Sequence, residues 1–168
     1  DLSSPVSPHA AAAAPKATAR AKAVADGKGS LTPADWLQTA ADVLVSKSVE
    51  GVRVDVLAKT LGVTRGSFYW HFTDRDDLLR RLFMSWKQTQ TVLQMDAYER
   101  KYRSPQDLLR AFTELPHHGR TAVRGGAIEL AIRAWARRDD MAREVVDEVD
   151  AMRMRHITNC FEGLGFDE

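Results

Sequence analysis

The stretch from Arg53 to Arg75, RVDVLAKTLGVTRGSFYWHFTDR, limits the possible folds of this chain more than any other feature. Its pattern predicts a short helix, a tight turn at Leu61-Gly62-Val63 and a second short helix rich in polar and aromatic residues. Two short helices joined by a glycine-containing turn are the sequence form of a helix-turn-helix, whose second helix lies in the major groove of DNA. We expect the rest of the chain to support this unit or to control it.

The overall charge does not identify a nucleic-acid binder, because 24 Lys and Arg against 23 Asp and Glu leave a net charge of +1. DNA binding must therefore depend on where individual charges lie. The single cysteine, Cys160, excludes an intrachain disulfide, and no Cys/His cluster has the spacing of a zinc site. We predict no metal, no cofactor and a cytoplasmic location. No apolar run approaches the ~18–20 residues that a membrane span needs.

Residues 1–30 are biased toward Ala, Pro, Ser and Lys and form a low-complexity N-terminal tail. One interpretation is a basic arm whose Lys16, Arg20, Lys22 and Lys28 reach DNA phosphates or a minor groove. A flexible tail is the interpretation that we favour.

Residues 31–79 are predicted to form a three-helix head. Thr32 is a suitable N-cap and Pro33 fits the first helical position, so the first helix begins there and ends before Gly51. The apolar residues of the three helices recur at the spacing of a shared core. They are Trp36, Leu37, Ala40, Ala41, Leu44 and Val45, then Val52, Val54, Leu57, Ala58 and Leu61, and finally Val63, Phe68 and Phe72.

Residues 80–168 are predicted to form a helical body, which makes the whole protein all-α. A long helix capped by Thr73 is expected to run to about Tyr102 and to join the head to the body. The expected later elements are a helix over Pro105–Leu115, a loop over 116–123, a helix over Gly125–Arg138 that is apolar nearly all round and buried, and a helix over Met141–Gly163 capped by Asp139 or Asp140.

The second helix of the helix-turn-helix carries candidates for DNA recognition. Thr64 would cap the helix, Arg65 could pair with guanine O6 and N7, and Gly66 would permit close approach of the backbone. Phe68 and Phe72, spaced i and i+4, are assigned to the core. Because five consecutive aromatic side chains cannot all face inward, some of Tyr69, Trp70 and His71 must be exposed. The full set of predicted DNA contacts is Arg53, Thr64, Arg65, Gly66, Ser67, Tyr69, Trp70, His71 and Arg75.

The run from Gly51 to Leu79, G-x-x-x-x-x-L-A-K-x-L-G-V-T-R-G-S-F-Y-W-H-F-x-D-R-D-x-L-L, resembles the signature of the TetR/AcrR family of transcriptional regulators. The stretch AIRAWARRDD, Ala131 to Asp140, and the helix after it are also similar to family members. The resemblance implies a homodimeric, usually repressing, DNA-binding protein whose helical body binds a small effector and then releases a palindromic operator.

Two departures from the family pattern are expected to matter. Arg53 stands where the family usually has a capping Thr or Ser, so it would reach a phosphate by charge. The family usually ends with two helices that build a four-helix dimer interface. Met141–Gly163 is the first of them, and the second is expected to be missing from residues 1–168.

The body carries candidates for an effector site and a dimer surface. Proposed effector contacts, weighed against ordinary core packing, are Phe83, Trp86, Phe112, Trp135 and Met152, with Gln90 and Arg133 as polar anchors. The proposed dimer interface follows one stripe of the last helix, namely Val145, Val149, Met152, His156 and Cys160. Arg143, Glu144, Asp147, Glu148, Asp150 and Arg153 are expected to form a solvated ion-pair ladder along that helix, and His117 and His118 to be solvated.

The sequence therefore predicts a ligand-responsive regulator with a DNA-binding head over residues 31–79 and an effector-binding and dimerisation body over 80–168. No Gly-rich phosphate loop, nucleophile elbow or pair of catalytic carboxylates is present, so we do not expect an enzyme. The alternative is a helical small-molecule or protein-binding module that retains the head as architecture.

Overall fold

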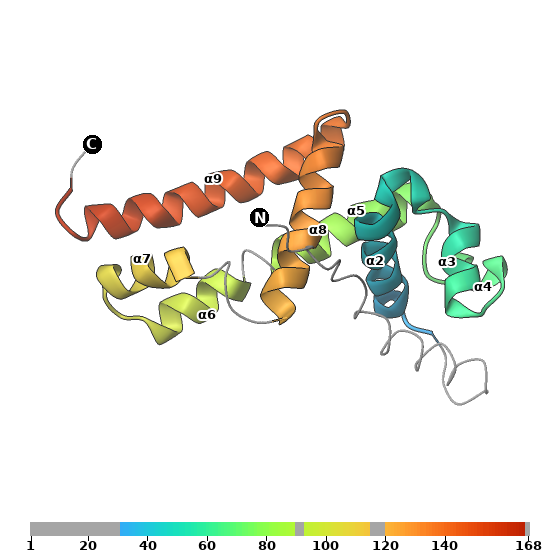
Figure 1. Ribbon diagram of the computed structural model, residues 1–168, viewed down its shortest axis with the longest axis horizontal. Helices are drawn as coiled ribbons and strands as arrows, with labels where there is room; N and C mark the ends of the chain where they lie inside the picture. The colour runs from blue at the N-terminus through green and yellow to red at the C-terminus, as the bar shows by residue number, and fades with distance from the viewer. Residues whose placement is uncertain (1–30, 90–92, 115–119, 167–168) are drawn as a thin grey trace, which may run out of the picture.

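The computed structural model describes residues 31–89, 93–114 and 120–166, and these contain eight α-helices and no strand. The helices are α2 (Pro33–Gly51), α3 (Val54–Leu61), α4 (Arg65–Tyr69), α5 (Arg75–Lys87), α6 (Leu93–Lys101), α7 (Pro105–Glu114), α8 (Arg120–Ala136) and α9 (Asp140–Glu162) (Figure 1). The all-helical prediction is confirmed. The predicted tail or basic arm over 1–30, His117 and His118 lie outside the described residues.

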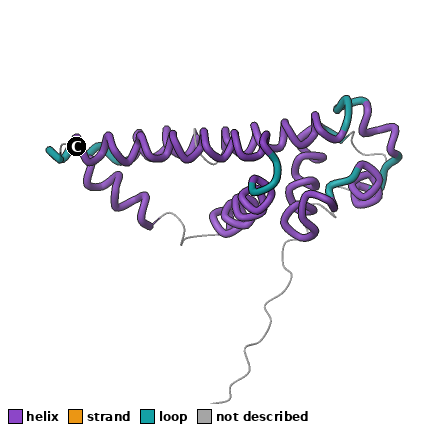
Figure 2. Tube along the Cα trace, turned by 90° about the horizontal axis from the view of Figure 1, so that it is seen from above, coloured by secondary structure: helices purple, strands orange, loops and turns teal. Residues whose placement is uncertain are grey.

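The molecule is elongated, with a small head at one end and a long body (Figure 2). Helices α2, α3 and α4 form the head, and α5 leads from it into the body beneath α8 and α9 (Figure 1). Helix α8 packs against both α2 and α9, so it joins head and body. One continuous apolar core runs from Leu31 in the head to Val149 in α9.

Helix α2 begins as the sequence predicts. Thr32 is its N-cap, with Pro33 at the first position, and the Asp35 carboxylate accepts hydrogen bonds from the Thr32 backbone N–H at 2.8 Å and from its hydroxyl at 2.7 Å. The backbone leaves the helical conformation at Ser48, where φ is 61° and ψ is −178°. This break, three residues before Gly51, ends the helix as predicted and turns the chain toward α3.

The head core is aromatic. Trp36 and Phe68 meet edge to face at 5.3 Å between ring centroids, and Phe68 stacks on Phe72 at 5.2 Å. Val52 and Leu57 are fully buried beside them. The predicted inner face of the three helices is therefore confirmed, except that Val45 is exposed.

Gly62 ends α3 and makes the turn of the helix-turn-helix. Its φ is 70° and its ψ is 30°, a left-handed conformation that side chains with a Cβ rarely adopt. The Val63 N–H donates to the Ala58 carbonyl at 3.0 Å, which closes the turn. This backbone geometry places the start of α4 next to the end of α3.

The long helix differs from its prediction at its N-terminal end. Asp74, not Thr73, is the N-cap, because its carboxylate accepts from the Asp77 N–H at 2.8 Å while the Asp77 carboxylate accepts from the Thr73 N–H at 3.1 Å. Helix α5 ends at Lys87, and α6 ends at Lys101, next to the predicted end at Tyr102. A π-helical turn over residues 88–89 follows α5, where the Thr89 hydroxyl donates to the Ser85 carbonyl at 2.5 Å. Such back-bonding by Thr bends helices.

The body helices differ from their predictions in extent and burial. Helix α8 begins at Arg120, five residues before the predicted start, and only part of its surface is buried. Ile132 and Trp135 enter the core, with the Trp135 ring 4.7 Å from that of Phe83, whereas Leu130 is 71% exposed. Asp139 caps α9 by accepting from the Ala142 N–H at 2.9 Å, as predicted.

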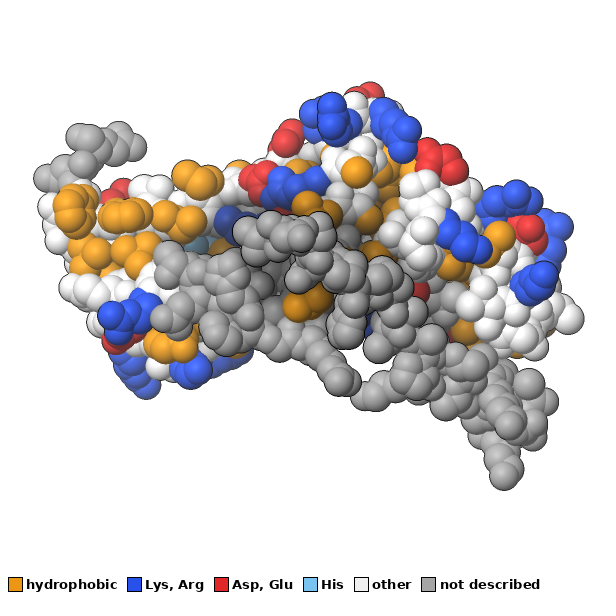
Figure 3. Space-filling model, in the orientation of Figure 1, with side chains coloured by type: hydrophobic (Ala, Val, Ile, Leu, Met, Phe, Trp, Pro, Cys, Tyr) orange, Lys and Arg blue, Asp and Glu red, His pale blue; other side chains and the backbone are white. Residues whose placement is uncertain are grey.

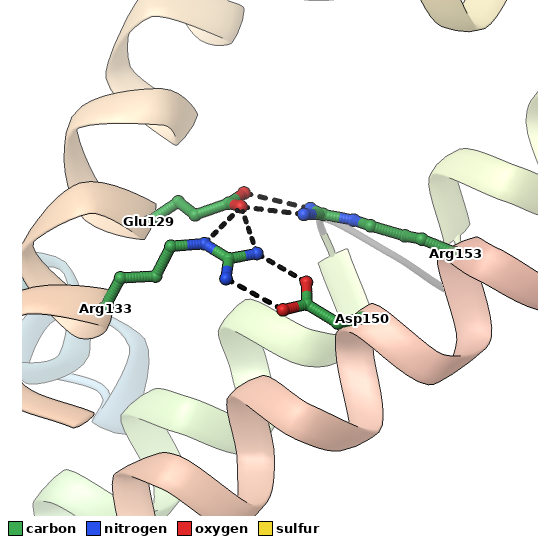
Figure 4. Close-up of polar contacts among 4 residues, drawn as sticks. All are labelled: Glu129, Arg133, Asp150 and Arg153. Atoms are coloured by element: carbon green, nitrogen blue, oxygen red, sulfur yellow. Dashed lines mark hydrogen bonds and ion pairs between the residues drawn. The ribbon is translucent and has the colours of Figure 1, made fainter. Parts of the chain in front are cut away.

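Ion pairs between helices replace part of the ladder expected along α9 (Figure 4). Asp150 accepts two hydrogen bonds from Arg133 of α8, one of them at 2.8 Å, and Arg153 donates to Glu129 at 2.7 and 2.9 Å. Arg133 also donates to Glu129 at 3.0 Å. The prediction that Asp150 and Arg153 serve a solvated ladder is wrong, because their partners lie 17 and 24 residues away on α8.

These contacts set the acidity of the two carboxyl groups. Burial raises the pKa of Glu129, but hydrogen bonds and charge from Arg153 and Arg133 outweigh this effect and leave the pKa below its ordinary value. The Arg133 hydrogen bond likewise lowers the pKa of Asp150. Both groups are therefore held ionised at neutral pH, and they join α8 to α9.

Candidate nucleic-acid interface

The outer face of α4 and the residues just after it carry large exposed side chains. Trp70 is 87% exposed and Tyr69 is 55% exposed. Phe68, the residue just before Tyr69, is fully buried. Tyr69 leans its ring edge on Phe68 at 5.2 Å, and His71 is partly buried beside Phe72. The division of this aromatic cluster into core and exposed residues, predicted from spacing, agrees with these exposures.

Arg65 is the exposed cation at the start of α4. Its guanidinium makes no hydrogen bond or ion pair with the residues that the structure describes. Arg53 differs, since it forms a two-pronged contact with Asp55 at 3.2 and 3.1 Å. The five N–H donors of Arg65 are therefore available for a planar acceptor such as guanine or phosphate.

Thr64 and Gly66 flank Arg65. Thr64 is the N-cap of α4, as predicted, with an extended backbone. Its side chain makes no cap hydrogen bond with the described residues, so its hydroxyl is left for another partner. A Cβ added to Gly66 would meet only the Thr64 hydroxyl oxygen, at 3.7 Å. Packing among the described residues therefore does not require glycine at 66, whereas close approach of another molecule would.

Arg75 has a structural role that the sequence did not suggest. Its guanidinium donates to the Val52 carbonyl at 2.6 Å and to the Val49 carbonyl at 2.7 Å, across the junction of α2 and α3. These bonds satisfy two carbonyl groups near the break at Ser48. The predicted phosphate contact falls on a side chain that already serves the fold, and only part of it, 37%, is exposed.

The basic side chains around α3 and α4 give this end of the molecule a local positive surface (Figure 3). Exposed Lys59 and Arg65 lie on these two helices, and exposed Arg53 is the N-cap of α3. The surface is small, and the net charge of +1 for the whole chain conceals it. The positions of individual basic side chains therefore say more about DNA binding than the total charge does, as the sequence indicated.

The structure describes the side chains of five of the seven predicted effector residues. Phe83 and Trp135 pack on each other in the core, and Met152 packs against the same core. Arg133 is engaged by Glu129 and Asp150. Trp86 lines a groove between α2, α5 and α8, whereas Gln90 and the side chain of Phe112 lie outside the described residues.

The predicted dimer stripe on α9 faces its own protomer. Val149 is fully buried, Cys160 is 6% exposed, and Val145 and Met152 pack against the core. His156 contacts Glu99 of α6, with its Nδ1 2.9 Å from a carboxylate oxygen. Burial raises the pKa of the Cys160 thiol. Much of this stripe is therefore occupied within the protomer, and its part in a dimer interface stays a prediction.

Long-range pairs that sequence reasoning missed tie the body to head helix α2. Arg124 of α8 donates to Asp42 at 2.6 Å, and Arg138, just after α8, lies 3.2 Å from Glu50. Burial raises the pKa of Asp42, while Arg124 opposes this shift. No local signal marks these residues, because the partners lie more than 80 residues apart in the chain.

Two negative observations concern the described residues alone. Residues 31–89, 93–114 and 120–166 contain no group of three His, Cys, Asp or Glu side chains that could hold a metal ion. None of the helices in these ranges is long and apolar enough to cross a lipid bilayer.

Comparison with known proteins agrees with this geometry. Residues 37–82, which include α3, α4 and their turn, match the family described as bacterial regulatory proteins, tetR family. An HTH-type transcriptional regulator, AcrR of Shigella flexneri, is 29% identical over 82 residues, which are 49% of this chain and 37% of that protein. The chain thus spans little more than a third of the length of this curated relative. No solved structure matches the chain. The match over residues 37–82 supports the resemblance to the TetR/AcrR family that the sequence signature indicated.

Proposed function

We propose that this protein is a sequence-specific DNA-binding transcriptional regulator whose α4 enters the major groove. The observation that carries the proposal is the surface of α4, where Arg65 is unpaired within the described residues and Tyr69 and Trp70 are exposed. Phe68 alone anchors this short helix in the core. A helix whose single buried residue holds it in place leaves its other side chains for base and phosphate contacts.

Individual roles follow from exposure and pairing. Arg65 reads a guanine edge, Tyr69 and Trp70 contact phosphates or base methyl groups, and Thr64 and Ser67 donate to phosphates. Gly66 allows the backbone to approach the duplex. Arg53 reaches the flanking phosphate after releasing Asp55. Residues 31–79 form the DNA-binding part and residues 80–168 the effector-binding and dimerisation part, joined by the shared core.

We further propose that a second copy of the chain covers an apolar surface on the body. Met154 is 60% exposed and Phe161 45% exposed on α9, and hydrophobic side chains gather along this end of the molecule (Figure 3). Two-fold symmetry would place two copies of α4 ~34–36 Å apart, or a multiple of this, on a palindromic operator. In the cytoplasm such a dimer would act as a repressor that an effector releases.

The salt dependence of DNA affinity tests the proposal. Binding to the DNA upstream of the protein's own coding sequence is measured by fluorescence anisotropy between roughly 50 and 200 mM salt. Over this range, affinity that depends on phosphate contacts falls strongly. We expect affinity to fall steeply with salt, since each neutralised phosphate contributes a slope of about −0.9. A flat dependence would contradict DNA binding and favour a helical binding module that keeps the head as architecture.

The mass of the protein in solution tests the dimer. We expect Met154→Glu to shift the dimer toward monomer, because it places a charge in the proposed apolar contact. Met84→Glu, at a methionine of similar exposure on α5, is the matched control and should leave the mass unchanged. A monomeric parent protein at micromolar concentration, or equal effects of both changes, would contradict the proposed face.

A further inference from the structure

A groove lies where head helix α2 meets body helices α5 and α8, away from the outer face of α4. Its volume is about 310 Å³, at the lower end of the roughly 300–1,000 Å³ typical of small-molecule sites. Residues of all three helices form its walls. A molecule bound there would therefore touch the DNA-binding head and the body at once.

The walls of the groove are mainly apolar. Leu37 of α2, Leu82 and Trp86 of α5, and Ile128 of α8 supply most of this surface. Leu82 and Trp86 are buried, whereas Leu37 and Ile128 are partly exposed. Partly exposed apolar side chains gain free energy when an apolar molecule covers them.

The charge balance of the groove disfavours an ionic ligand. Arg124 is the charged residue of the lining, and its guanidinium is already paired with Asp42 at 2.6 Å. The pair is neutral as a unit, and an anion would have to compete with Asp42 for the same donors. An uncharged molecule meets no such competition.

Trp86 leaves one polar group without a partner. The residue is 4% exposed, and its indole N–H makes no hydrogen bond to any part of the chain that the structure describes. A buried donor without an acceptor is unfavourable. Because Trp86 lines the groove, we expect this N–H to donate to a carbonyl or ether oxygen on a molecule bound there.

We propose that the α2–α5–α8 groove binds an uncharged, largely apolar ring compound that carries a hydrogen-bond acceptor. Occupancy would fix the angle between α2 and the two body helices. Any effect on operator affinity rests on the proposed DNA-binding function, whereas ligand binding itself does not.

Titration with prodan, an uncharged naphthalene ketone whose emission shifts to the blue in apolar surroundings, tests the site on the full chain. We expect saturable one-to-one binding. Ala34→Phe, at an exposed residue of the groove wall, should fill the space and weaken binding at least tenfold. Ala97→Phe, at an exposed alanine of α6 outside the groove, should change the affinity less than twofold. Absence of saturable binding, or equal affinity in Ala34→Phe with unchanged melting temperature, would overturn the proposal.

A second variant tests the hydrogen bond. Trp86→Phe keeps an aromatic ring but removes the N–H, so it should weaken prodan binding about fivefold. Equal affinity would show that Trp86 donates no hydrogen bond to the ligand and would overturn that part of the assignment. Circular dichroism and melting temperature check that both variants are folded.

Operator binding with and without saturating prodan tests the regulatory part. We expect a change in operator affinity of at least fivefold, the lower end of ordinary allosteric coupling. Unchanged affinity with a filled groove would overturn the coupling. Failure of the unliganded protein to bind DNA would contradict the proposed function, and the prodan titration would still decide whether the groove is a binding site.

Discussion

Arg65 in the head and the two arginines that join α8 to α9 are used in opposite ways. In the α8–α9 pair, Arg133 and Arg153 each bind carboxylates of the same chain. In the head, Arg65 on α4 has no such partner among the described residues, while the aromatic core around Phe68 holds the helix in place. The charges of Arg133 and Arg153 thus stabilise the body, whereas the charge of Arg65 in the head remains available for another molecule.

The comparison explains why exposure and pairing together identify a functional surface. Trp70 alone, at 87% exposure, would be one exposed aromatic residue among several. It lies beside Arg65, which has no partner within residues 31–89, 93–114 and 120–166, and beside Gly66, whose added Cβ would meet no tight contact, and this combination favours a surface for a partner. The ion pairs of α8 and α9 show that arginines elsewhere in the chain are readily paired when the fold requires it.

The largest expected effect comes from the head core. Phe68→Ala should lower the free energy of unfolding by about 3–5 kcal/mol, because it removes a fully buried ring that packs on Trp36 and Phe72. Trp70→Ala, two residues away, should change it by less than about 0.5 kcal/mol. Urea unfolding measures both. Similar losses of unfolding free energy for the two changes would contradict the assignment of Phe68 to the core and Trp70 to the exposed face.

Arg75→Lys should have the next largest effect, about 2–3 kcal/mol, because a lysine cannot replace both guanidinium hydrogen bonds to the Val49 and Val52 carbonyls. Arg80→Lys, at an exposed arginine of the same helix, is the control and should be nearly neutral. Thermal unfolding of both variants tests this assignment. If Arg75→Lys is as stable as the parent, Arg75 is free for DNA as the sequence first suggested.

Acid should weaken the α8–α9 pair selectively. The pKa of Glu129 is lowered from its ordinary value of 4.5, so its stabilisation is present above that pH and is lost as pH falls through the folded-state value. Glu129→Gln should cost about 1–2 kcal/mol at pH 7 and progressively less below pH ~4.5. Urea unfolding across this range measures the difference. Glu144→Gln, at an exposed residue of α9, should show no such trend; a pH-independent loss in Glu129→Gln would contradict the ion-pair role.

The smallest effect is a gain in stability at the α2–α3 junction. Ser48 has φ 61° and ψ −178°, a backbone region that is unfavourable for residues other than glycine. Relief of this backbone strain in Ser48→Gly should raise the free energy of unfolding by about 1 kcal/mol. Loss of the hydrogen bond from the Ser48 hydroxyl to Glu50 should offset part of that gain. Ser46→Gly, two residues earlier in regular helix, should lower it by ~0.5–1 kcal/mol. A gain in stability for Ser48→Gly together with a loss for Ser46→Gly, measured by thermal unfolding, would confirm the non-helical backbone at Ser48. A loss of stability in both variants would contradict it.

The sequence predicted local features better than distant ones. Caps at Thr32 and Asp139 and the i, i+4 pair Phe68 and Phe72 depend on neighbours within four residues, so their patterns were sufficient. Thr73 and Asp74 are adjacent residues that can both cap a helix, and only the position of Asp77 decides between them. The sequence around Thr73 and Asp74 alone could not show which of them is the N-cap.

Partners far apart in the chain were not predictable. Arg75 binds carbonyls 23 and 26 residues away, so its local basic character suggested a phosphate contact instead. Val149 and Cys160 lie on an apolar stripe that suits a partner subunit or the protomer's own core equally well, and packing against the body decided for the core. Periodicity shows that a face is buried but not which surface covers it.

Operator affinity of Arg65→Ala measured beside its unfolding temperature tests the central claim that α4 presents a surface that the fold does not need. We expect at least a tenfold loss of affinity for the upstream DNA, since a bidentate guanine contact is worth about 1–3 kcal/mol, with the melting temperature unchanged. Arg137→Ala, at an exposed arginine beyond α8, should alter neither quantity. Unchanged affinity in Arg65→Ala, or an equal loss in Arg137→Ala, would contradict the account.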